Sequence, residues 1–235
     1  MLIPNKGALI KGLLLLVTFA VVLVAMFLPL INGHNALEAA DKLFNSIAKG
    51  STYYIEDLLK KTQALKETSF TANLNFDKPE TAEQTAKILS TAGAQTKAEG
   101  TKVTVTGNLQ QVLLAALADS DAMFKNNEQP LVQKYGLPGK QALLVWWKSL
   151  KEIHKDLTRQ KQFALAASID TVIKKGVEVG YNFYGIQAQT ASSRAGVLAF
   201  ALIFYVVYTL WWGVAIMFLF DAFGLEMKKK VKKEV

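Results

Sequence analysis

The sequence predicts a membrane protein with two transmembrane α-helices and an α+β extracytoplasmic domain, built as a helical stalk with an inserted small β-α-β-β-α module. Two uncharged stretches, residues 12–31 and 195–220, predict the membrane helices. The 235-residue chain is 51% hydrophobic and 20% charged, which is too apolar for one soluble domain and too polar for a transporter with many spans. Roughly 160 residues separate the two stretches, a normal length for one domain.

Composition excludes several kinds of chemistry. The chain has no cysteine, so disulfides, thiolate metal sites and Cys-ligated iron–sulfur clusters are ruled out. The net charge is +8, but about +4 of it lies in residues 1–33 and 195–235, beside the apolar stretches. The middle of the chain is only mildly basic, and we therefore expect no nucleic-acid partner.

The first predicted span occupies residues 12–32, after a cytoplasmic N-terminus of residues 1–11. An uncharged run of about 20 residues matches the thickness of a bilayer at 1.5 Å per residue. A cleaved signal peptide is the alternative. The run exceeds the usual apolar region of such a peptide and no small-x-small site follows promptly, so an uncleaved anchor is favoured.

The second predicted span occupies residues 195–220 and precedes a basic tail of residues 221–235. Lysines favour the cytoplasmic side of a membrane, and they flank both spans. We therefore expect both termini in the cytoplasm and the main domain in the periplasm or outside the cell, with the chain in the cytoplasmic (inner) membrane. The lysines that determine this topology are Lys6, Lys11, Lys228, Lys229, Lys230, Lys232 and Lys233.

Residues 33–68 are predicted to form two membrane-proximal helices. Leu37, Ala40, Phe44 and Ile47 recur at spacings of three and four, as on one face of a helix that Lys49 and Gly50 would end. A second helix should run to about Glu67, with apolar residues Ile55, Leu58, Leu59 and Leu65. Such a pair directly above the bilayer is typical of a stalk.

Residues 69–126 are predicted to form the α+β module. Apolar residues alternate from Phe70 to Phe76, as in a half-buried strand, and a helix begins near Pro79. A hairpin should turn at Glu99-Gly100, with Val103 and Val105 facing inward, before a helix capped by Asn108. This order matches five of the six elements of a ferredoxin-like sandwich. That architecture carries no functional inference.

Residues 127–194 are predicted to form a long amphipathic helix or helices. Apolar residues from Leu143 to Leu157 follow helical spacing, which resumes at Leu165 after a polar stretch. One long helix is favoured over two stacked ones, and the spacing leaves open whether the helix is continuous around residues 158–162. Tyr181, Phe183 and Tyr184 could contribute to an aromatic belt near the membrane. Adjacent helical residues point about 100° apart, so one of Trp146 and Trp147 should enter the core while the other points sideways.

Candidate catalytic and cofactor sites are lacking in the sequence. The two histidines, His34 and His154, are far apart, and neither a Gly-x-Ser-x-Gly nor a phosphate-binding Gly-rich motif occurs. We therefore expect no enzyme activity, no catalytic residues, no metal and no cofactor in this chain.

The second span carries a candidate partner interface. Ala201, Tyr205, Tyr208 and Trp212 fall on one stripe, and a tyrosine within a span prefers a hydrogen-bond partner to bare lipid. Small residues four apart permit close packing of helices. The partner could be the first span or another subunit. The small residues are Ser192, Ala195, Gly196 and Ala199.

These features predict a non-catalytic accessory or scaffold subunit of a larger membrane complex, which binds other membrane subunits or itself through its transmembrane helices. The alternative is an extracytoplasmic ligand-binding or sensory protein that signals through a partner. The predicted tail of about 15 residues is too short for an output domain of its own.

Overall fold

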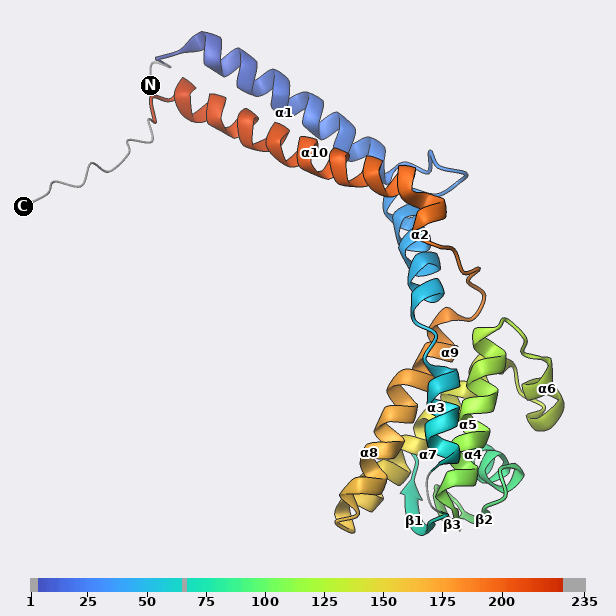
Figure 1. Cartoon of the computed structure of the whole chain (residues 1–235). Helices are drawn as coiled ribbons and strands as arrows, with labels where there is room; N and C mark the ends of the chain where they lie inside the picture. The colour runs from blue at the N-terminus through green and yellow to red at the C-terminus, as the bar shows by residue number, and fades with distance from the viewer. Residues whose placement is uncertain (1–3, 65–66, 226–235) are drawn as a thin grey trace, which may run out of the picture. The chain divides into compact units, whose positions relative to one another are not determined.

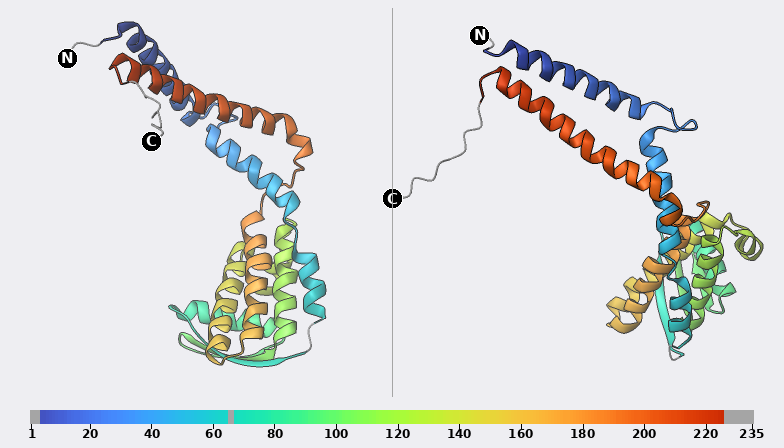
Figure 2. Two further views of the ribbon diagram at one scale, coloured as in Figure 1. Left: turned by 60° about the vertical axis from the view of Figure 1, so that its left-hand side comes forward. Right: turned by 45° about the horizontal axis from the view of Figure 1, so that its top comes forward.

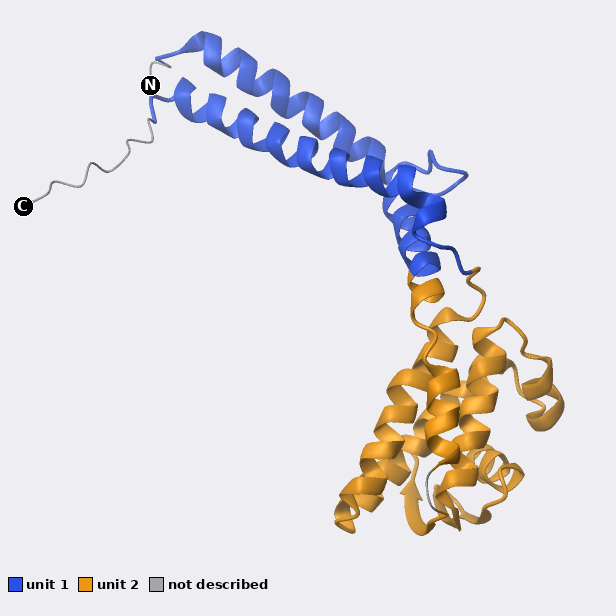
Figure 3. Ribbon diagram, in the orientation of Figure 1, with its two compact units in different colours: residues 1–47, 188–235 blue, residues 48–187 orange. Residues whose placement is uncertain are grey.

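A computed structural model describes residues 4–64 and 67–225. The chain divides into two compact units (Figure 3). Residues 1–47 and 188–235 form one, which we call the helical unit, and residues 48–187 form the other, the α+β unit. The fold is a mostly helical α+β arrangement with one three-stranded antiparallel sheet.

The helical unit is built on two long apolar helices, α1 (Lys6–Phe27) and α10 (Ala195–Ala222), which lie side by side (Figures 1 and 2). A short 3₁₀ turn, Ser192–Arg194, precedes α10. The start of α1 meets the end of α10, because the Asn5 side-chain amide donates a hydrogen bond of 2.9 Å to Asp221. The side-chain oxygen Oδ1 of Asn5 also accepts from the backbone nitrogen of Ala8, which caps α1.

Small residues allow α1 and α10 to pack closely. Ala8 and Gly12 are buried on α1, as are Ala215 and Ala222 on α10. Both helices are long and apolar enough to cross a membrane. Only 6% of the most apolar window of each is buried, whereas the core helix of a soluble protein is mostly buried. Their outer apolar surfaces are therefore left for lipid or a partner to cover.

The first helix differs from its predicted bounds. It begins at Lys6 and ends at Phe27, and residues 28–31 leave the helix before a bridge between Ile31 and His34. The helix α10 extends two residues beyond the predicted end at Phe220. The tail lysines Lys228, Lys229, Lys230, Lys232 and Lys233 lie outside the described residues.

Both helices predicted in residues 33–68 form, with bounds and surroundings that differ from the expected ones. The helix α2 (Ala36–Ser51) forms as expected, but its Leu37 and Phe44 are 52% and 53% exposed. The next helix, α3 (Ile55–Gln63), ends before the predicted Glu67 and packs against α5 within the α+β unit. Its Ile55 and Leu58 are buried in that core. Leu65 lies outside the described residues.

The predicted order of strands and helices in the module is confirmed. The strands are β1 (Ser69–Asn75), β2 (Gln95–Glu99) and β3 (Lys102–Asn108), in the order β1-β3-β2. Two helices connect and follow them, α4 (Pro79–Thr91) and α5 (Leu109–Phe124). Ala72 pairs with Val105 and Leu74 with Val103, and all four side chains are buried on the side of the sheet that the helices cover (Figure 2).

The region after α5 contains more elements than expected. A short helix, α6 (Gln129–Tyr135), lies where the sequence indicated no element. The stretch whose continuity the sequence left open forms two helices, α7 (Gly139–Arg159) and α8 (Phe163–Val172), with Lys161 between them in a left-handed conformation at φ 62°. The chain continues through a π-helical turn, Ile173–Val177, into α9 (Glu178–Phe183).

The module is not an insertion between independent helices, because the whole α+β unit shares one core. Side chains from α3, the sheet, α4 to α8 and the π-helical turn form a single buried cluster. Tyr181, Phe183 and Tyr184 are partly buried and pack against this cluster. Gly180 permits the close approach of α9 to α5, since a Cβ there would lie 2.6 Å from the backbone oxygen of Ser120.

The open edge of β1 is covered by α7. The Asp156 carboxylate accepts a 2.9 Å hydrogen bond from the backbone nitrogen of Asn73, and the Gln160 side chain donates to the backbone oxygen of Thr71 at 2.8 Å. These side chains satisfy backbone groups that a neighbouring strand would otherwise bond. Within the described residues, α7 thus occupies the edge where a further strand was sought.

Candidate functional sites

An aromatic cluster joins α1 and α10 near their middle. The ring of Phe19 stacks on Tyr208, with centroids 4.1 Å apart and planes 16° apart, and it also contacts Trp212 at 4.9 Å. Tyr208 in turn stacks on Phe204, one helical turn earlier, at 5.3 Å. Aromatic pairs in this geometry each add about 0.5–1.5 kcal/mol beyond burial of their area.

The residues of the predicted stripe on α10 lie in two different environments. Ala201 and Tyr208 are partly covered where α10 faces α1, so part of the stripe meets the chain's own first helix. Tyr205 and Trp212 are 65% and 45% exposed on the flank of the pair. The small residues are on yet another face and stay exposed; they are Ser192, Ala195, Gly196 and Ala199.

A hollow of about 390 Å³ lies on that flank of the helix pair. It opens between the two helices rather than on one of them, since α1 contributes one wall and α10 the others. We call this surface, together with Tyr205, the aromatic flank. The residues that line the hollow are Phe19, Tyr208, Thr209 and Trp212.

The polar atoms of the aromatic flank are only partly satisfied. The Tyr208 hydroxyl is buried and has no hydrogen-bond partner within residues 4–64 and 67–225. Trp211, by contrast, donates its indole hydrogen to the backbone oxygen of Leu15 at 3.2 Å. Tyr205 and Tyr208 lie within about 5 Å of the midpoint of the 28-residue α10.

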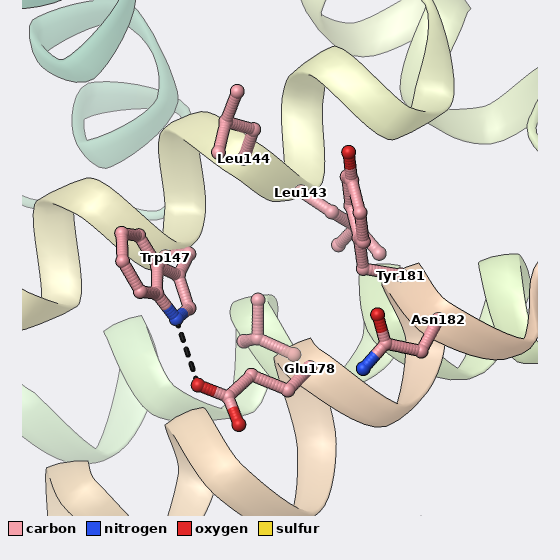
Figure 4. Close-up of a pocket in the computed structure, with 7 residues that line it drawn as sticks. Leu143, Leu144, Trp147, Glu178, Tyr181 and Asn182 are labelled. Carbon is pink, nitrogen blue, oxygen red and sulfur yellow. Dashed lines mark hydrogen bonds between the residues drawn. The ribbon is translucent and has the colours of Figure 1, made fainter.

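A second candidate site is a pocket of about 290 Å³ within the α+β unit (Figure 4). Trp147 of α7 and Tyr181 of α9 stand on opposite sides of it, with Leu143 between them (Figure 4). The indole nitrogen of Trp147 donates a 2.9 Å hydrogen bond to Glu178. Leu144, Val177 and Asn182 complete the lining.

The prediction for the tryptophan pair is confirmed. Trp146 is fully buried in the core of the α+β unit, where its indole nitrogen donates to Asp119 at 2.9 Å. Trp147 points sideways into the pocket. Glu178 and Tyr181 were not identified from the sequence as site residues, because the π-helical turn before α9 changes the direction in which they face.

The two histidines take part in separate local interactions. His34 bonds Glu38 at 3.2 Å through Nδ1 and Lys42 at 2.7 Å through Nε2, at the start of α2. His154 lies on α7 in the α+β unit. Among the topology lysines within the described residues, Lys6 is exposed and Lys11 lies 5.8 Å from the ring centroid of Phe218 on α10.

Comparison with known proteins gives no relative for this chain: no family model, no curated protein and no solved structure matches it.

Proposed function

We propose that this protein is a non-catalytic accessory or scaffold subunit, held in a membrane by α1 and α10 and docked onto another membrane protein through the aromatic flank. The observation that carries the proposal is the exposure of Tyr205 and Trp212 beside a hollow of about 390 Å³ near the middle of the helix pair. The two helices pack against each other along one face only.

The chemistry of the flank favours a helix as the occupant. A ridge of side chains on a third helix fits a groove between two packed helices. A hydroxyl in hydrocarbon gains about 0.6–2 kcal/mol from an acceptor on a neighbouring helix, and Tyr205 presents one. Lipid tails would fill the hollow but would offer no hydrogen-bond acceptor to the Tyr205 hydroxyl. Docking of another subunit is therefore favoured over a solitary anchor.

The orientation is part of the same proposal. Because α1 and α10 run in opposite directions, both chain ends belong on one side of the membrane and the α+β unit on the other. Lys6, Lys11 and the tail lysines favour the cytoplasm for the ends, and so the periplasm or the cell exterior for the α+β unit. Changing the five tail lysines to Glu should disturb this topology in a protease-protection assay. An unchanged protection pattern would count against it.

The docking proposal is tested by co-purification from native membranes. Tyr205→Leu combined with Trp212→Leu keeps the flank apolar but removes the hydroxyl, the indole nitrogen and the aromatic walls. We expect the stoichiometric yield of partner subunits to fall about tenfold, since loss of an anchor of 1.4 kcal/mol or more has that effect.

A matched control is Phe200→Leu. It removes an aromatic ring that is exposed on the same helix but lies about 140° around from Tyr205. The control should retain its partners. If the double variant also keeps the wild-type stoichiometry, the aromatic flank is not the docking surface.

The sensory alternative needs a ligand site in the α+β unit. The pocket between Trp147 and Tyr181 is the observation that keeps this alternative open.

A further inference from the structure

The pocket of the α+β unit has two aromatic walls and an apolar floor. Trp147 and Tyr181 face it from α7 and α9 (Figure 4), and the lining residues Leu143 and Val177 are buried. Its volume of about 290 Å³ is at the lower end of the range for small-molecule sites. The size therefore suits a compact ligand with an apolar body.

The lining carries a single charge. Glu178 is the only ionisable carboxylate or amine among the seven lining residues. Its Oε1 accepts the hydrogen bond from Trp147, and its Oε2 has no hydrogen bond to any residue in the described ranges. A ligand with a positive charge would complement this carboxylate, whereas an anion would be repelled by it.

The faces of aromatic rings attract cations, and a lysine that does not line the pocket already lies over each of the two rings. The Lys151 ammonium lies 3.9 Å from the ring centroid of Trp147, and the Lys140 ammonium lies 5.4 Å from that of Tyr181. Neither lysine lines the pocket. Both are exposed, so the high dielectric constant of water weakens the repulsion that they would exert on a bound cation.

The walls are held in place before any ligand arrives. The hydrogen bond to Glu178 fixes the orientation of the Trp147 ring. The π-helical turn Ile173–Val177 directly precedes Glu178, and Gly180 seats α9 against the backbone of α5. Single π-helical turns often occur at functional sites, where they redirect side chains. A preformed pocket loses less free energy on binding than one that must be ordered.

We propose that this pocket binds a small organic cation, an alkyl- or arylammonium compound, between Trp147 and Tyr181 with its charge on Glu178. Cation–π attraction supplies part of the affinity and the carboxylate supplies the rest. The inference does not depend on the docking of the helix pair, because every residue involved belongs to the α+β unit.

The test is calorimetric titration of the full chain in detergent. The probes are choline, benzyltrimethylammonium and 3,3-dimethylbutan-1-ol, the last being a neutral compound of the same shape as choline. We expect at least one cation to bind, and the neutral compound to bind at least about tenfold more weakly than choline or not at all. Failure of both cations to bind at about 10 mM, or equal binding of choline and its neutral counterpart, would overturn the proposal.

Two variants locate the binding. Glu178→Gln keeps an oxygen that can accept from Trp147 but removes the charge, and it should weaken cation binding about tenfold or more. Glu56→Gln removes a carboxylate that lies outside the pocket and pairs with Lys60, and it should bind as the wild type does. Equal affinities for Glu178→Gln and the wild type would show that the cation binds elsewhere.

Discussion

The indole nitrogen of Trp146 and the hydroxyl of Tyr135 both donate to one carboxylate oxygen of the buried Asp119, at 2.9 Å and 2.5 Å. The Lys134 ammonium bonds the other oxygen at 2.7 Å. Asp119 lies on α5, so these bonds tie α5 to α6 and α7 inside the core. A buried carboxylate is stable only when it is paired and hydrogen-bonded in this way.

Asp119→Ala should strongly destabilise the α+β unit. The substitution leaves the buried donors of Trp146 and Tyr135 without an acceptor, and each buried donor left unsatisfied typically costs about 1–3 kcal/mol. Denaturant unfolding of the full chain in detergent, followed by near-ultraviolet circular dichroism, measures it. Asp57→Ala, at an exposed position of α3, is the control and should change stability by less than about 0.5 kcal/mol. A similar small change for Asp119→Ala would contradict the structural role of Asp119.

The same cluster predicts a loss of stability in alkaline solution. Burial, with help from the hydrogen bond to Asp119, raises the pKa of Tyr135 above its ordinary value of 10.0. The folded protein therefore holds this proton more tightly than the unfolded chain does. The resulting stabilisation is complete below about pH 10 and is lost as the pH rises above it. Unfolding free energies measured between pH 9 and pH 11 should fall less steeply for Tyr135→Phe. Parallel curves would contradict this origin of the pH dependence.

The cover that α7 places on β1 can be removed selectively. Asp156→Ala deletes the acceptor of the Asn73 backbone nitrogen, while Lys140→Ala changes the first turn of the same helix, where the lysine lies beside Tyr181. A hydrogen bond to a charged group contributes about 1.5–3 kcal/mol, so amide exchange at Asn73 should accelerate about tenfold or more. Amides of β3 serve as an internal reference. Unchanged exchange at Asn73 would show that Asp156 does not protect the edge.

Gly12 should be essential for the packing of α1 on α10. A Cβ at this position would lie 2.9 Å from Cδ2 of Leu219 and 3.1 Å from its backbone nitrogen, so a larger residue must push the helices apart. The chain has no cysteine, and replacing the bonded pair Asn5 and Asp221 by cysteines therefore gives one defined cross-link. Its oxidative yield should drop severalfold with Gly12→Ile. Gly213→Ile is the control, since nothing lies within 4 Å of its Cβ position. Equal yields for both would argue against close packing at Gly12.

A buried lysine closes the α+β unit where the chain leaves α9. The Lys49 ammonium donates to the backbone oxygens of Phe183 and Ile186, at 3.0 Å and 2.6 Å, and to the Asn126 side chain at 3.0 Å. Burial lowers the pKa of Lys49. Lys49→Met keeps the length of the side chain but removes all three bonds, and limited proteolysis should then cut near residues 184–187 at least severalfold faster. Lys42→Met is the control, and equal cleavage rates would contradict a clamping role for Lys49.

Local signals explain which parts of the fold could be predicted. The alternation in β1 and the Asn108 cap, whose side chain accepts from the backbone nitrogen of Gln111, depend on neighbouring residues and can be read from sequence. The shift in apolar spacing around residues 158–162 marked the place of the break between α7 and α8 but did not settle it, because Lys161 adopts a positive φ without the usual Gly or Pro signal. The short α6 was missed for a similar reason, since seven residues give too little periodicity.

The candidate sites show the same limit. The Tyr205, Tyr208 and Trp212 stripe was visible in the sequence, but its partner Phe19 was not, because α1 is apolar on every side and carries no periodic signal. Trp147 could be expected to point away from the core. Glu178 and Tyr181 could not be assigned to the same pocket as Trp147, since a π-helical turn and the packing of α9 determine which way their side chains face.

The most direct test of the proposed role is native mass measurement after gentle detergent extraction from the membranes in which the protein occurs. A subunit docked through the aromatic flank should migrate as a stable hetero-complex, with other membrane proteins in fixed stoichiometry to this 25.9 kDa chain. A solitary chain, at the mass of one protomer with no partner in any mild detergent, would contradict the proposal.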